Sequence, residues 1–472
     1  MRTRKPLDNT PSGCYHFPVL SMSVPIFLRI SGPDFHGLKE GRGRMGKAPE
    51  KPVVTIVGGG MITQVQILPS IYQLQRLGTV GDINVTALNA APLRVLDEDE
   101  TLRRAFPGQK FAAHPDFREA DPKAQFPELY KEVIERMPPR SIVFVAVPDQ
   151  LHYPVVKFAL EHDQHVATVK PLVLKYEQAV EIERIAYERG LFVGVEYHKR
   201  FDDRSLMARM AYRDGRFGEF KLGNARLLEC WYYRHSNFQN WMTVENSDAF
   251  AYIGCHYIDL VHFITGLLPT AVSVYGIEEK YPNGKKGFFW TDGRVIWENG
   301  ACLNVQNGLG YPDDAPGGND QGMVLYGRGE DLGTLIIHSD QYRGVKHSYV
   351  KKGGDPGDTI YAEPNPDYFK LVNAGGKGLT AVGYGYRSIA AIISAACRIE
   401  KETAMLSGAK ALAARRKLIK EIDGEGIIAT PANSSYNELV MEAGRKSILA
   451  GGREVVIEYG DKPGVSFRKH RD

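Results

Sequence analysis

The amino-acid sequence predicts an α/β fold with a doubly wound parallel sheet in its first half and an α+β region with a mostly antiparallel sheet in its second half. Up to about residue 200, short apolar runs alternate with helical segments, which is the pattern of βαβ units. Beyond Phe201 the apolar segments are short, rich in β-branched residues and bounded by Gly, Asn, Asp and Pro, which indicates antiparallel strands. A chain of 472 residues is also long enough for two domains with cores of their own.

The first βα unit carries a glycine-rich turn, in which three glycines follow a β-branched apolar run and a helix-competent segment begins at Met61. Gly58 permits a sharp turn, Gly60 lets backbone N–H groups approach a pyrophosphate, and the following helix presents its positive end there. The predicted ligand is a dinucleotide, NAD or NADP, contacted by Gly58, Gly60, Met61 and Ile62. The alternative is a plain turn, because Thr63 stands where the third glycine of this motif belongs.

The second strand, expected over Ile83–Leu88, ends where the adenosine ribose of such a ligand would lie. An acidic residue usually holds the ribose hydroxyls at this point, whereas this chain has Asn89, with Arg94 shortly behind it. Asn89 can hydrogen-bond a 2′-hydroxyl, and Arg94 can pair with a 2′-phosphate. The choice between NAD and NADP therefore stays open, and Arg94 fits a solvated helix position equally well.

The rest of the first half continues the alternation of strands and helices. Ser141–Val147 is a nearly continuous apolar run, as expected for a strand buried on both faces of a parallel sheet. Further strands are expected at Phe111–Phe117, His165–Leu172 and Leu191–Val195, and helices at Val65–Leu77, Val155–Glu161 and Leu174–Arg189.

The second half is predicted to be richer in strands. Val345–Gly383 has no periodicity and is rich in Gly, Pro, Lys and Asp, so we expect a long loop or a segment that contacts a partner. Helices at Tyr386–Ile399 and Asn433–Ala450 close the chain. The expected strands are Lys221–Tyr233, Ala271–Glu278, Arg294–Glu298, Ala301–Asn307, Gly322–Tyr326 and Thr334–His338.

Composition argues against several classes of partner. A net charge of +3 from 59 basic and 56 acidic residues offers no polyelectrolyte surface, so neither nucleic acid nor a membrane is expected as a partner. Five scattered cysteines without a Cys-x-x-Cys pair favour neither a disulfide framework nor a zinc knuckle, and a cytoplasmic location fits. Residues 1–50 hold one interrupted apolar patch too short to span a bilayer, so we expect a flexible leader, or a start at Met45.

Four short motifs, taken in order, resemble the Gfo/Idh/MocA family of NAD(P)-dependent oxidoreductases, which act mostly on sugars, inositols and their derivatives. The resemblance runs from about Lys51 to Tyr459, and Asn433–Tyr459 is similar to the last helix and strand of that family. It implies an N-terminal Rossmann domain at residues 51–200. It also implies a C-terminal domain for substrate binding and oligomerisation at residues 201–472, with a large open, mostly antiparallel sheet and last helices that pack back on the first domain. The motifs are Gly58–Gly60, Val147–His152, Val169–Pro171 and Gly254–Asp259, and the second adds Pro148 and His152 to the expected cofactor contacts.

The resemblance also implies the catalytic residues. Lys170 matches the lysine of the family's Glu-Lys-Pro motif, at the cofactor, where a cation stabilises charge developing on the substrate oxygen. Val169 replaces the Glu of that motif and cannot make its contact with the nicotinamide ribose. His256 matches the active-site histidine and suits proton transfer to and from a hydroxyl. Tyr252 stands where inositol dehydrogenases have an Asp, so its phenol is expected to hydrogen-bond the substrate or to carry a proton.

Several other residues are expected near the substrate. Tyr197, His198 and Arg200 follow the last parallel strand and lie at the crevice, although Arg200 is equally suited to tie the two halves together. Trp231 and Trp241 bound a stretch of aromatics and amides that suits stacking on sugar C–H faces, and core packing gives the same composition.

An acidic and histidine-containing segment follows His256. On a helix, Asp259 lies one turn from His256, where we expect it to orient the imidazole or contact the substrate, or to serve as a helix-start anion. His262 is a third ligand-type side chain, but on a helix it points away from the other two, so no metal site is expected.

Together these features predict an NAD(P)-dependent oxidoreductase that transfers a hydride between nicotinamide and a secondary hydroxyl or ketone of a sugar, glycoside or cyclitol. One alternative is an enzyme that cleaves glycosides through transient oxidation by NAD, and another is a non-catalytic dinucleotide-binding sensor. The expected partners are a small carbohydrate or polyol and further copies of the chain, in a dimer or tetramer formed through the open sheet.

Overall fold

The computed structural model describes residues 51–121, 123–315, 319–339, 349–352, 359–362 and 368–469, of which 349–352 and 359–362 are described as backbone only. The expected leader at residues 1–50 and part of the expected loop Val345–Gly383 lie outside the described residues. Pro49–Asp472 forms one compact unit.

The first half contains a six-stranded sheet in which every pair of neighbouring strands is parallel. The strand order is β3-β2-β1-β4-β5-β6, so the direction of winding reverses between β1 and β4, which is the Rossmann arrangement. The predicted doubly wound sheet is therefore confirmed. The strands are β1 (Val54–Val57), β2 (Ile83–Thr86), β3 (Ala112–His114), β4 (Ile142–Val145), β5 (His165–Val169) and β6 (Val193–Glu196).

Helices account for much of the remaining described chain. Several expected helices are found with shifted ends, and the helix after the glycine turn begins earlier than expected because its first turns are π-helical. The helices and helical turns of the first half are η1 (Thr63–Ile67), α1 (Leu68–Arg76), α2 (Ala90–Glu98), α3 (Glu100–Ala105), α4 (Leu129–Glu135), η2 (Asp149–Leu151), α5 (His152–Glu161), α6 (Tyr176–Arg189) and η3 (His198–Phe201). Those of the second half are α7 (Asp203–Arg213), η4 (Trp231–His235), α8 (Phe238–Trp241), η5 (Phe250–Gly254), α9 (Cys255–Thr265), α10 (Tyr384–Thr403), α11 (Gly408–Glu425), α12 (Pro431–Ser434) and α13 (Tyr436–Leu449).

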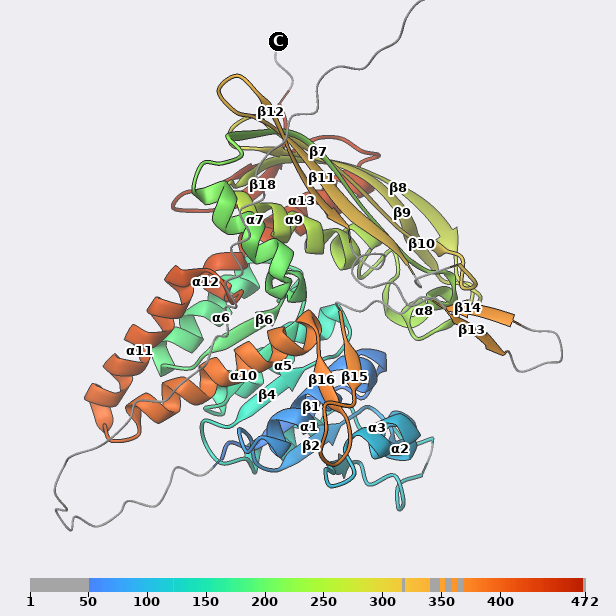
Figure 1. The fold of residues 1–472 in the computed structure, drawn as a ribbon, viewed down its shortest axis with the longest axis vertical. Helices are drawn as coiled ribbons and strands as arrows, with labels where there is room; N and C mark the ends of the chain where they lie inside the picture. Colours follow the sequence, from blue (N-terminus) through green and yellow to red (C-terminus); the bar gives the residue numbers. More distant parts are fainter. Residues whose placement is uncertain are drawn as a thin grey trace, which may run out of the picture. The chain divides into compact units, whose positions relative to one another are not determined.

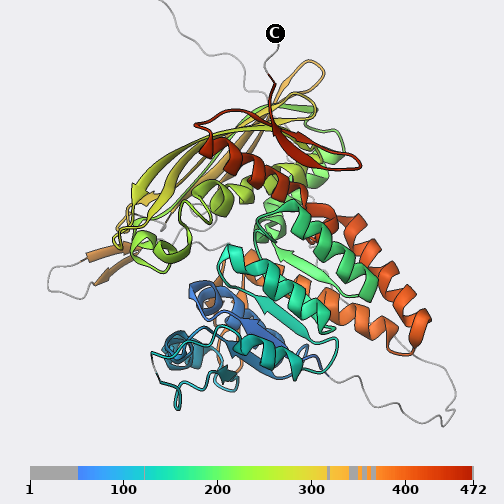
Figure 2. The same ribbon diagram turned by 180° about the vertical axis from the view of Figure 1, so that it is seen from behind.

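The two faces of the parallel sheet belong to two different cores. Side chains such as Val143 pack with α5 and α6, whereas their neighbours, such as Phe144, pack with α1 and α10. Figure 1 shows α10 crossing the sheet on one side, and Figure 2 shows the helices that cover the other side. Gly194 gives α10 room to approach, because a Cβ there would lie 2.6 Å from Ile392. A helix from late in the chain thus completes the N-terminal fold.

The second half contains an eight-stranded sheet of order β12-β11-β7-β10-β9-β8-β17-β18. Its neighbouring strands are antiparallel except for β7 and β10, which confirms the predicted mostly antiparallel sheet. Helices α9 and α13 pack on one face and share its core. The strands are β7 (Glu219–Cys230), β8 (Pro269–Lys280), β9 (Lys286–Trp297), β10 (Cys302–Tyr311), β11 (Asp320–Arg328), β12 (Gly333–Ser339), β17 (Val455–Glu458) and β18 (Gly464–Phe467).

Several elements differ from the sequence-based expectations. Helix α11 was not predicted, because only a few of its side chains, Ala411, Ile419 and Ile422, are buried and the apolar periodicity is weak. The expected loop contains two two-stranded sheets, β13 (Tyr349–Lys352) with β14 (Thr359–Ala362), and β15 (Lys370–Val372) with β16 (Thr380–Val382). Strands this short carry little periodicity of their own.

One buried carboxyl couples this fold to pH. Glu438 on α13 is 1% exposed, and burial raises its pKa from 4.5 to about 8, although backbone groups of Leu172 and Val173 partly oppose the shift. Between about pH 4.5 and pH 8 the folded protein therefore holds a proton that the unfolded chain releases. The free energy of unfolding falls as the pH rises through this window, and the whole penalty is present above it.

The substitution Glu438→Gln removes this penalty while keeping the shape of the side chain. We expect the melting temperature of the variant to fall less than that of the wild type between about pH 6 and about pH 9, by a margin equivalent to a few kcal/mol. Thermal denaturation followed by circular dichroism measures this. Parallel pH profiles for the two proteins would contradict the assignment.

Candidate functional site

A cavity of about 470 Å³ lies where the ends of the parallel strands meet the second half of the chain. Met61 and Ile62, which open the helix after the glycine turn, line it together with Lys170 from the end of β5 and His256 from α9. The cavity therefore brings together the cation and the imidazole that the sequence predicts to be catalytic, beside the predicted cofactor loop.

The glycine turn has the geometry that a dinucleotide site requires. Gly58 has φ +117°, and a Cβ there would lie 2.1 Å from the carbonyl oxygen of Ala146, so the turn excludes any other residue. A Cβ on Gly60 would meet no atom within 4 Å, which leaves open space beside the start of the helix. Thr63, in place of the third glycine, donates its hydroxyl to the Gly58 carbonyl at 2.6 Å and braces the turn. These residues fit a pyrophosphate held by backbone N–H groups.

The residues expected near the adenosine ribose already have intramolecular partners. Asn89 caps α2, its side-chain oxygen accepting from the Ala91 N–H at 3.1 Å, which leaves its amide nitrogen for a ligand. Arg94 donates to the Phe117 carbonyl at 2.7 Å and lies over that ring. The arginine is thus held on the protein surface, in line with the alternative reading of a solvated helix residue.

Pro148 lines the cavity, but the other predicted cofactor residue of its motif does not. His152 is wholly buried, and its Nδ1 and Nε2 lie 2.8 Å and 2.9 Å from the carbonyl oxygens of Pro171 and Val147. The ring therefore joins the ends of β4 and β5 behind the cavity wall, which corrects the expected contact with the cofactor to a positioning role.

Lys170 is fixed by Tyr252. The ammonium lies 3.7 Å from the centre of the Tyr252 ring and donates to the Tyr252 backbone carbonyl. Burial, with the charges of Glu229 and Asp149, raises the pKa of the Tyr252 phenol well above its ordinary value. The phenol lines the cavity, so the expected hydrogen bond to the substrate stays a prediction, and the ring in addition supports Lys170.

Asp149, next to Pro148, is a cavity residue that the sequence analysis missed. It is 4% exposed and accepts a hydrogen bond from the Ser247 hydroxyl at 3.1 Å. Burial raises its pKa, and the charges of His152 and Lys170 oppose that rise. The sequence could have indicated Asp149 as a cavity residue, because it lies between two residues of the same motif, Pro148 and His152.

His256 lines the cavity as a buried, neutral imidazole. Burial lowers its pKa well below the ordinary value, and the charges of Lys170, His198 and Lys199 lower it further. Among the described residues its Nδ1 has no hydrogen-bond partner. The expected orienting residue, Asp259, does not reach it.

His198 and the missed residue Glu196 form a second polar group in the cavity. The Nδ1 atom of His198 lies 3.1 Å from a carboxylate oxygen of Glu196, and the His198 ring centre lies 4.9 Å from that of His256. The expected place of His198 near the substrate is therefore consistent with its position in the cavity wall. The sequence could have indicated Glu196 as a site residue, because it is a carboxylate at the end of a buried parallel strand.

The wall on the side of the antiparallel sheet is also polar. Lys199 from η3 donates to Gln321 on β11, and Glu229 at the end of β7 faces the same space. Burial raises the pKa of Glu229, while the charges of Lys170 and Lys199 oppose the rise. These three residues were missed because strand-end polar residues look alike in sequence whether they face solvent or a cavity.

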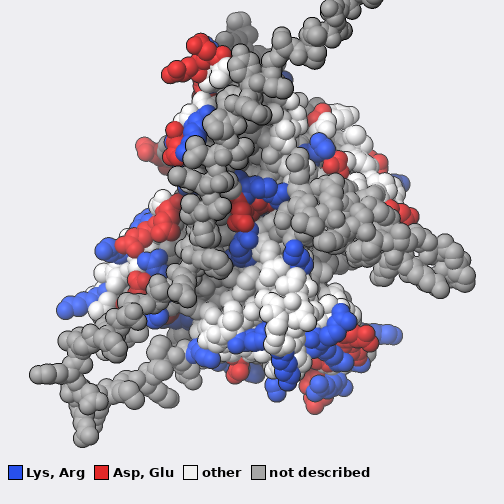
Figure 3. Space-filling view, in the orientation of Figure 1, with Lys and Arg blue, Asp and Glu red and all other residues white. Residues whose placement is uncertain are grey.

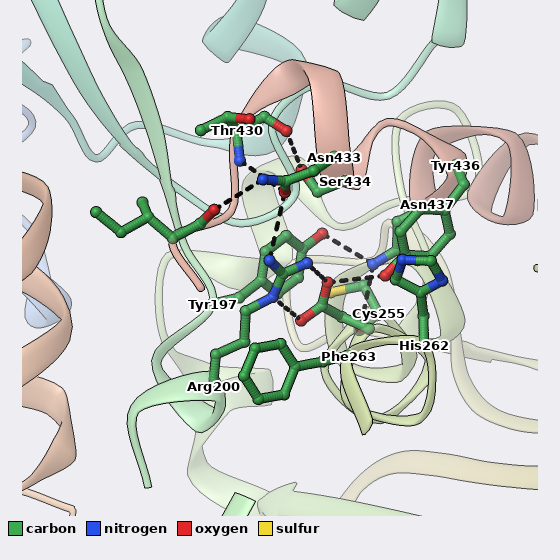
Figure 4. A network of polar contacts seen from close by, with 12 residues as sticks. Tyr197, Arg200, Cys255, His262, Phe263, Thr430, Asn433, Ser434, Tyr436 and Asn437 are labelled. Carbon is green, nitrogen blue, oxygen red and sulfur yellow. Dashed lines mark hydrogen bonds and ion pairs between the residues drawn. The ribbon is translucent and has the colours of Figure 1, made fainter. Parts of the chain in front are cut away.

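Tyr197, Arg200 and Asp259 belong to a polar network outside the cavity, in which Figure 4 labels Tyr197 and Arg200. Arg200 is 1% exposed and donates to both carboxylate oxygens of Asp259, at 2.8 Å and 2.6 Å. Tyr436 donates to the same carboxylate at 2.9 Å, and Asn437 donates to the Tyr197 hydroxyl at 2.9 Å. The expected substrate contacts of these three residues are thus corrected to a tie between η3, α9 and α13.

The two tryptophans separate in the structure. Trp241 is buried and lines the cavity, with its ring centre 5.4 Å from that of Tyr252. Trp231 is 43% exposed, lies outside the cavity lining and packs under the Arg234 guanidinium at 3.9 Å. Of the two expected stacking residues, the structure therefore leaves Trp241 in position to meet a ligand.

The expected loop also supplies part of the cavity. Tyr368 from this segment lines it beside Tyr384 of α10, and the Tyr368 hydroxyl donates to Gln66 of η1. The Leu379 N–H donates to the Ala105 carbonyl at 2.9 Å, which anchors this segment on the nucleotide-binding half. The sequence analysis did not predict this role because the segment has no apolar periodicity.

Neither a metal site nor a membrane-spanning helix is found in the described part of the chain. His262 makes contacts within its own surroundings. Its Nδ1 lies 2.8 Å from the Leu267 carbonyl oxygen, and its ring packs on Tyr436. On the face that Figure 3 shows, basic and acidic side chains of the described residues are interspersed.

The order of the parallel strands, the glycine turn and the cavity beside it are those of a Rossmann-type dinucleotide-binding fold. Comparison with known proteins agrees. Residues 53–197 match the Gfo/Idh/MocA model, an oxidoreductase family with an NAD-binding Rossmann fold. This match covers the nucleotide-binding part of the chain, which is similar to that family.

Individual relatives are more distant. An uncharacterized oxidoreductase of Schizosaccharomyces pombe is 30% identical over 147 residues, which cover 30% of this chain and 39% of that protein. D-glucoside 3-dehydrogenase of Escherichia coli is 28% identical over 139 residues, or 28% of this chain and 38% of that protein. These alignments span about two fifths of the relatives' lengths.

The similarity of fold extends further than the similarity of sequence. The crystal structure of scyllo-inositol dehydrogenase from Lactobacillus casei, with bound NAD(H) and scyllo-inositol, aligns with a TM-score of 0.54 at 14% identity. The alignment covers 86% of this chain and 99% of that one, so both halves share its fold.

The open space at Gly60 gives a direct test of the cofactor site. We expect Gly60→Leu to fold normally and to lose at least about 100-fold in affinity for NAD(H) and NADP(H), because the side chain fills the space left for the pyrophosphate. Gly108→Leu, at a glycine whose Cβ also meets no atom within 4 Å, is the control. Isothermal titration measures both, and unchanged affinity in Gly60→Leu would place the dinucleotide elsewhere.

The buried ion pair gives a second test. Asp259→Asn leaves the Arg200 guanidinium buried without its counter-ion, so we expect the free energy of unfolding to fall by about 3–5 kcal/mol. The exposed pair of Arg184 and Glu188 is the control, and Glu188→Gln should cost no more than about 0.5 kcal/mol. Urea denaturation measures both. A loss in Asp259→Asn as small as in the control would show that the network contributes little.

Proposed function

We propose that this protein is an NAD(P)-dependent oxidoreductase that converts a secondary hydroxyl of a sugar, glycoside or cyclitol to a ketone, and the reverse. The observation that carries the proposal is the shared cavity, in which Lys170 and two imidazoles face the start of the cofactor helix. The dehydrogenase names of the inositol and glucoside relatives support the substrate class.

The residues of the cavity suit this chemistry. The bound nicotinamide supplies a hydride acceptor or donor. Lys170 stabilises the negative charge that develops on the substrate oxygen, and its fixed position over Tyr252 means that little reorganisation is needed. His256 or His198 takes the hydroxyl proton. Asp149, Glu229 and Gln321 offer hydrogen bonds to further hydroxyls, and Trp241 offers an apolar face.

A substitution that removes the positive charge of Lys170 tests this proposal. We expect Lys170→Met to lower kcat by about 100-fold or more while the affinity for the cofactor stays within about twofold, because the charge acts mainly in the transition state. Lys175→Met, at an exposed lysine outside the cavity, is the control. Initial rates of reduced-nicotinamide formation with a panel of polyols and sugars measure the effect. Unchanged turnover in Lys170→Met would remove the lysine from the mechanism.

The same panel separates the alternatives. A dehydrogenase accumulates reduced nicotinamide with its substrate. An enzyme that cleaves glycosides through transient oxidation releases the aglycone without net reduction, and a sensor binds the cofactor without either reaction. The presence of both Lys170 and His256 in the cavity favours turnover over sensing.

The proposal includes a homo-oligomer and a cytoplasmic location. The face of the eight-stranded sheet that α9 and α13 leave uncovered carries exposed apolar side chains, a surface that a second copy would bury. Of the described cysteines, Cys255, Cys302 and Cys397 form no disulfide, which agrees with a reducing compartment. The exposed apolar residues are Leu222, Tyr275, Ile277, Tyr326, Leu335 and Ile337.

A further inference from the structure

Glu196 and His198 form a carboxylate–imidazole pair in the cavity, and the proposed function leaves open which of the two histidines moves the proton. We propose that His198, held by Glu196, accepts the proton of the substrate hydroxyl during oxidation and returns it during reduction. His256 then serves as a neutral hydrogen-bonding partner of the reacting oxygen. This inference rests on the proposed function, because it assigns the proton step of that reaction.

Glu196 is built into the site from several directions. It pairs with Val169 in the register of β5 and β6, so both side chains lie on the α1 and α10 face of the sheet. It is 3% exposed, and one carboxylate oxygen accepts from Gln66 at 2.9 Å and from the Ser388 hydroxyl. The other oxygen faces His198. Donors on η1, α10 and η3 therefore fix this carboxylate.

The carboxylate determines which nitrogen of His198 is basic. Because Glu196 accepts from Nδ1–H, the lone pair of the neutral ring lies on Nε2. The ring stands among three other aromatic rings of the cavity wall, with centres 4.9 Å away at His256, 5.4 Å at Tyr368 and 5.6 Å at Tyr384. Its plane is therefore held before substrate arrives, which a general base requires.

His256 lacks these features. No described carboxylate is hydrogen-bonded to it, and Lys170 and Lys199 both disfavour a positive charge on its ring. His198 instead contacts the carboxylate of Glu196, and Glu229 on the side of the antiparallel sheet lines the same cavity as a second acidic group. The remaining groups that face His198 are Lys199, His256, Tyr368 and Tyr384.

The proton and electron count of the step is complete. In oxidation the substrate O–H bond breaks and its proton moves to Nε2 of His198. The C–H bond breaks with its electron pair, which leaves as hydride to the nicotinamide, and the carbon–oxygen double bond forms. In reduction the imidazolium of His198 returns the proton to the oxygen.

Kinetics of the full-length holoenzyme distinguish the two histidines. We expect His198→Gln to lower kcat about 100-fold or more with unchanged cofactor affinity, and His256→Gln to lower kcat less than about 10-fold while raising KM. The opposite ranking of the two variants would overturn the assignment.

The pH profile tests Glu196 as the positioning residue. Oxidation needs the ring unprotonated, and the carboxylate favours the protonated ring. In Glu196→Gln the acid limb of the kcat profile should therefore move to lower pH, with a plateau lowered about 10-fold, whereas Glu196→Asp keeps the wild-type limb. His165 and Glu400 form a similar pair at 3.1 Å outside the cavity, so Glu400→Gln is the matched control. An acid limb that does not move in Glu196→Gln would refute the role.

A measurement without turnover keeps this inference separate from the proposed function. In protein labelled with ¹⁵N-histidine, Nδ1–H of His198 should give a low-field proton signal that disappears in both His198→Gln and Glu196→Gln. The signal of His165 serves as an internal reference. If no polyol or sugar is oxidised but the signal behaves as expected, the proposed substrate class is wrong and the pair stands. If the signal persists in Glu196→Gln, the pair itself is wrong.

Discussion

The buried ion pair between Arg200 and Asp259 is the constraint on which the site depends. Arg200 follows the last parallel strand, and Asp259 lies one turn beyond His256 on α9, so their bidentate contact fixes that helix against the nucleotide-binding half. Tyr436 extends the tie to α13. Lys170 follows β5 and His256 lies in the first turn of α9, so this network ties together the two parts of the chain that carry them. A buried pair of this kind contributes to positioning even where its net contribution to stability is small.

Charged and titratable side chains of opposite sign also lie close together in the site. Two lysines, two histidines and three carboxylates line one cavity, where burial lowers the pKa of His256 and raises those of Asp149 and Glu229, with neighbouring charges acting on all three. The lysines suppress positive charge on His256, while the carboxylates of Glu196 and Glu229 face His198. Two side chains of the same type thereby obtain different environments within about 5 Å of each other. Enzymes commonly use such differences in environment to give two side chains of the same type different pKa values and different roles.

Much of the scaffold was readable in the sequence because its signals are local. The glycine turn, the apolar run Ser141–Val147 and the alternation of strands and helices predicted the parallel sheet with its order of elements. The motifs around Lys170 and His256 predicted two groups that now share a cavity. Both π-helical turns, η1 and η5, contribute cavity residues, and such turns leave no signature in apolar periodicity.

What the sequence did not reveal depends on long-range contacts. Arg200 and Asp259 are residue types that bind sugars, and only the fold shows that each satisfies the other. The carboxylate of Glu196, which contacts His198, is held by Gln66 and Ser388. These two residues are 130 and 192 residues away from Glu196 in the chain. Tyr368 lies in a segment without periodicity, yet it reaches the cofactor helix.

A crystal structure of the protein with NAD(H) or NADP(H) and a polyol is the most direct measurement of the central claim. The account predicts that the pyrophosphate lies over Gly60 and that the nicotinamide ring enters the cavity, with the reacting hydroxyl between Lys170 and the two imidazoles. A dinucleotide bound with its nicotinamide outside the cavity, or a substrate oxygen beyond the reach of Lys170, would contradict it.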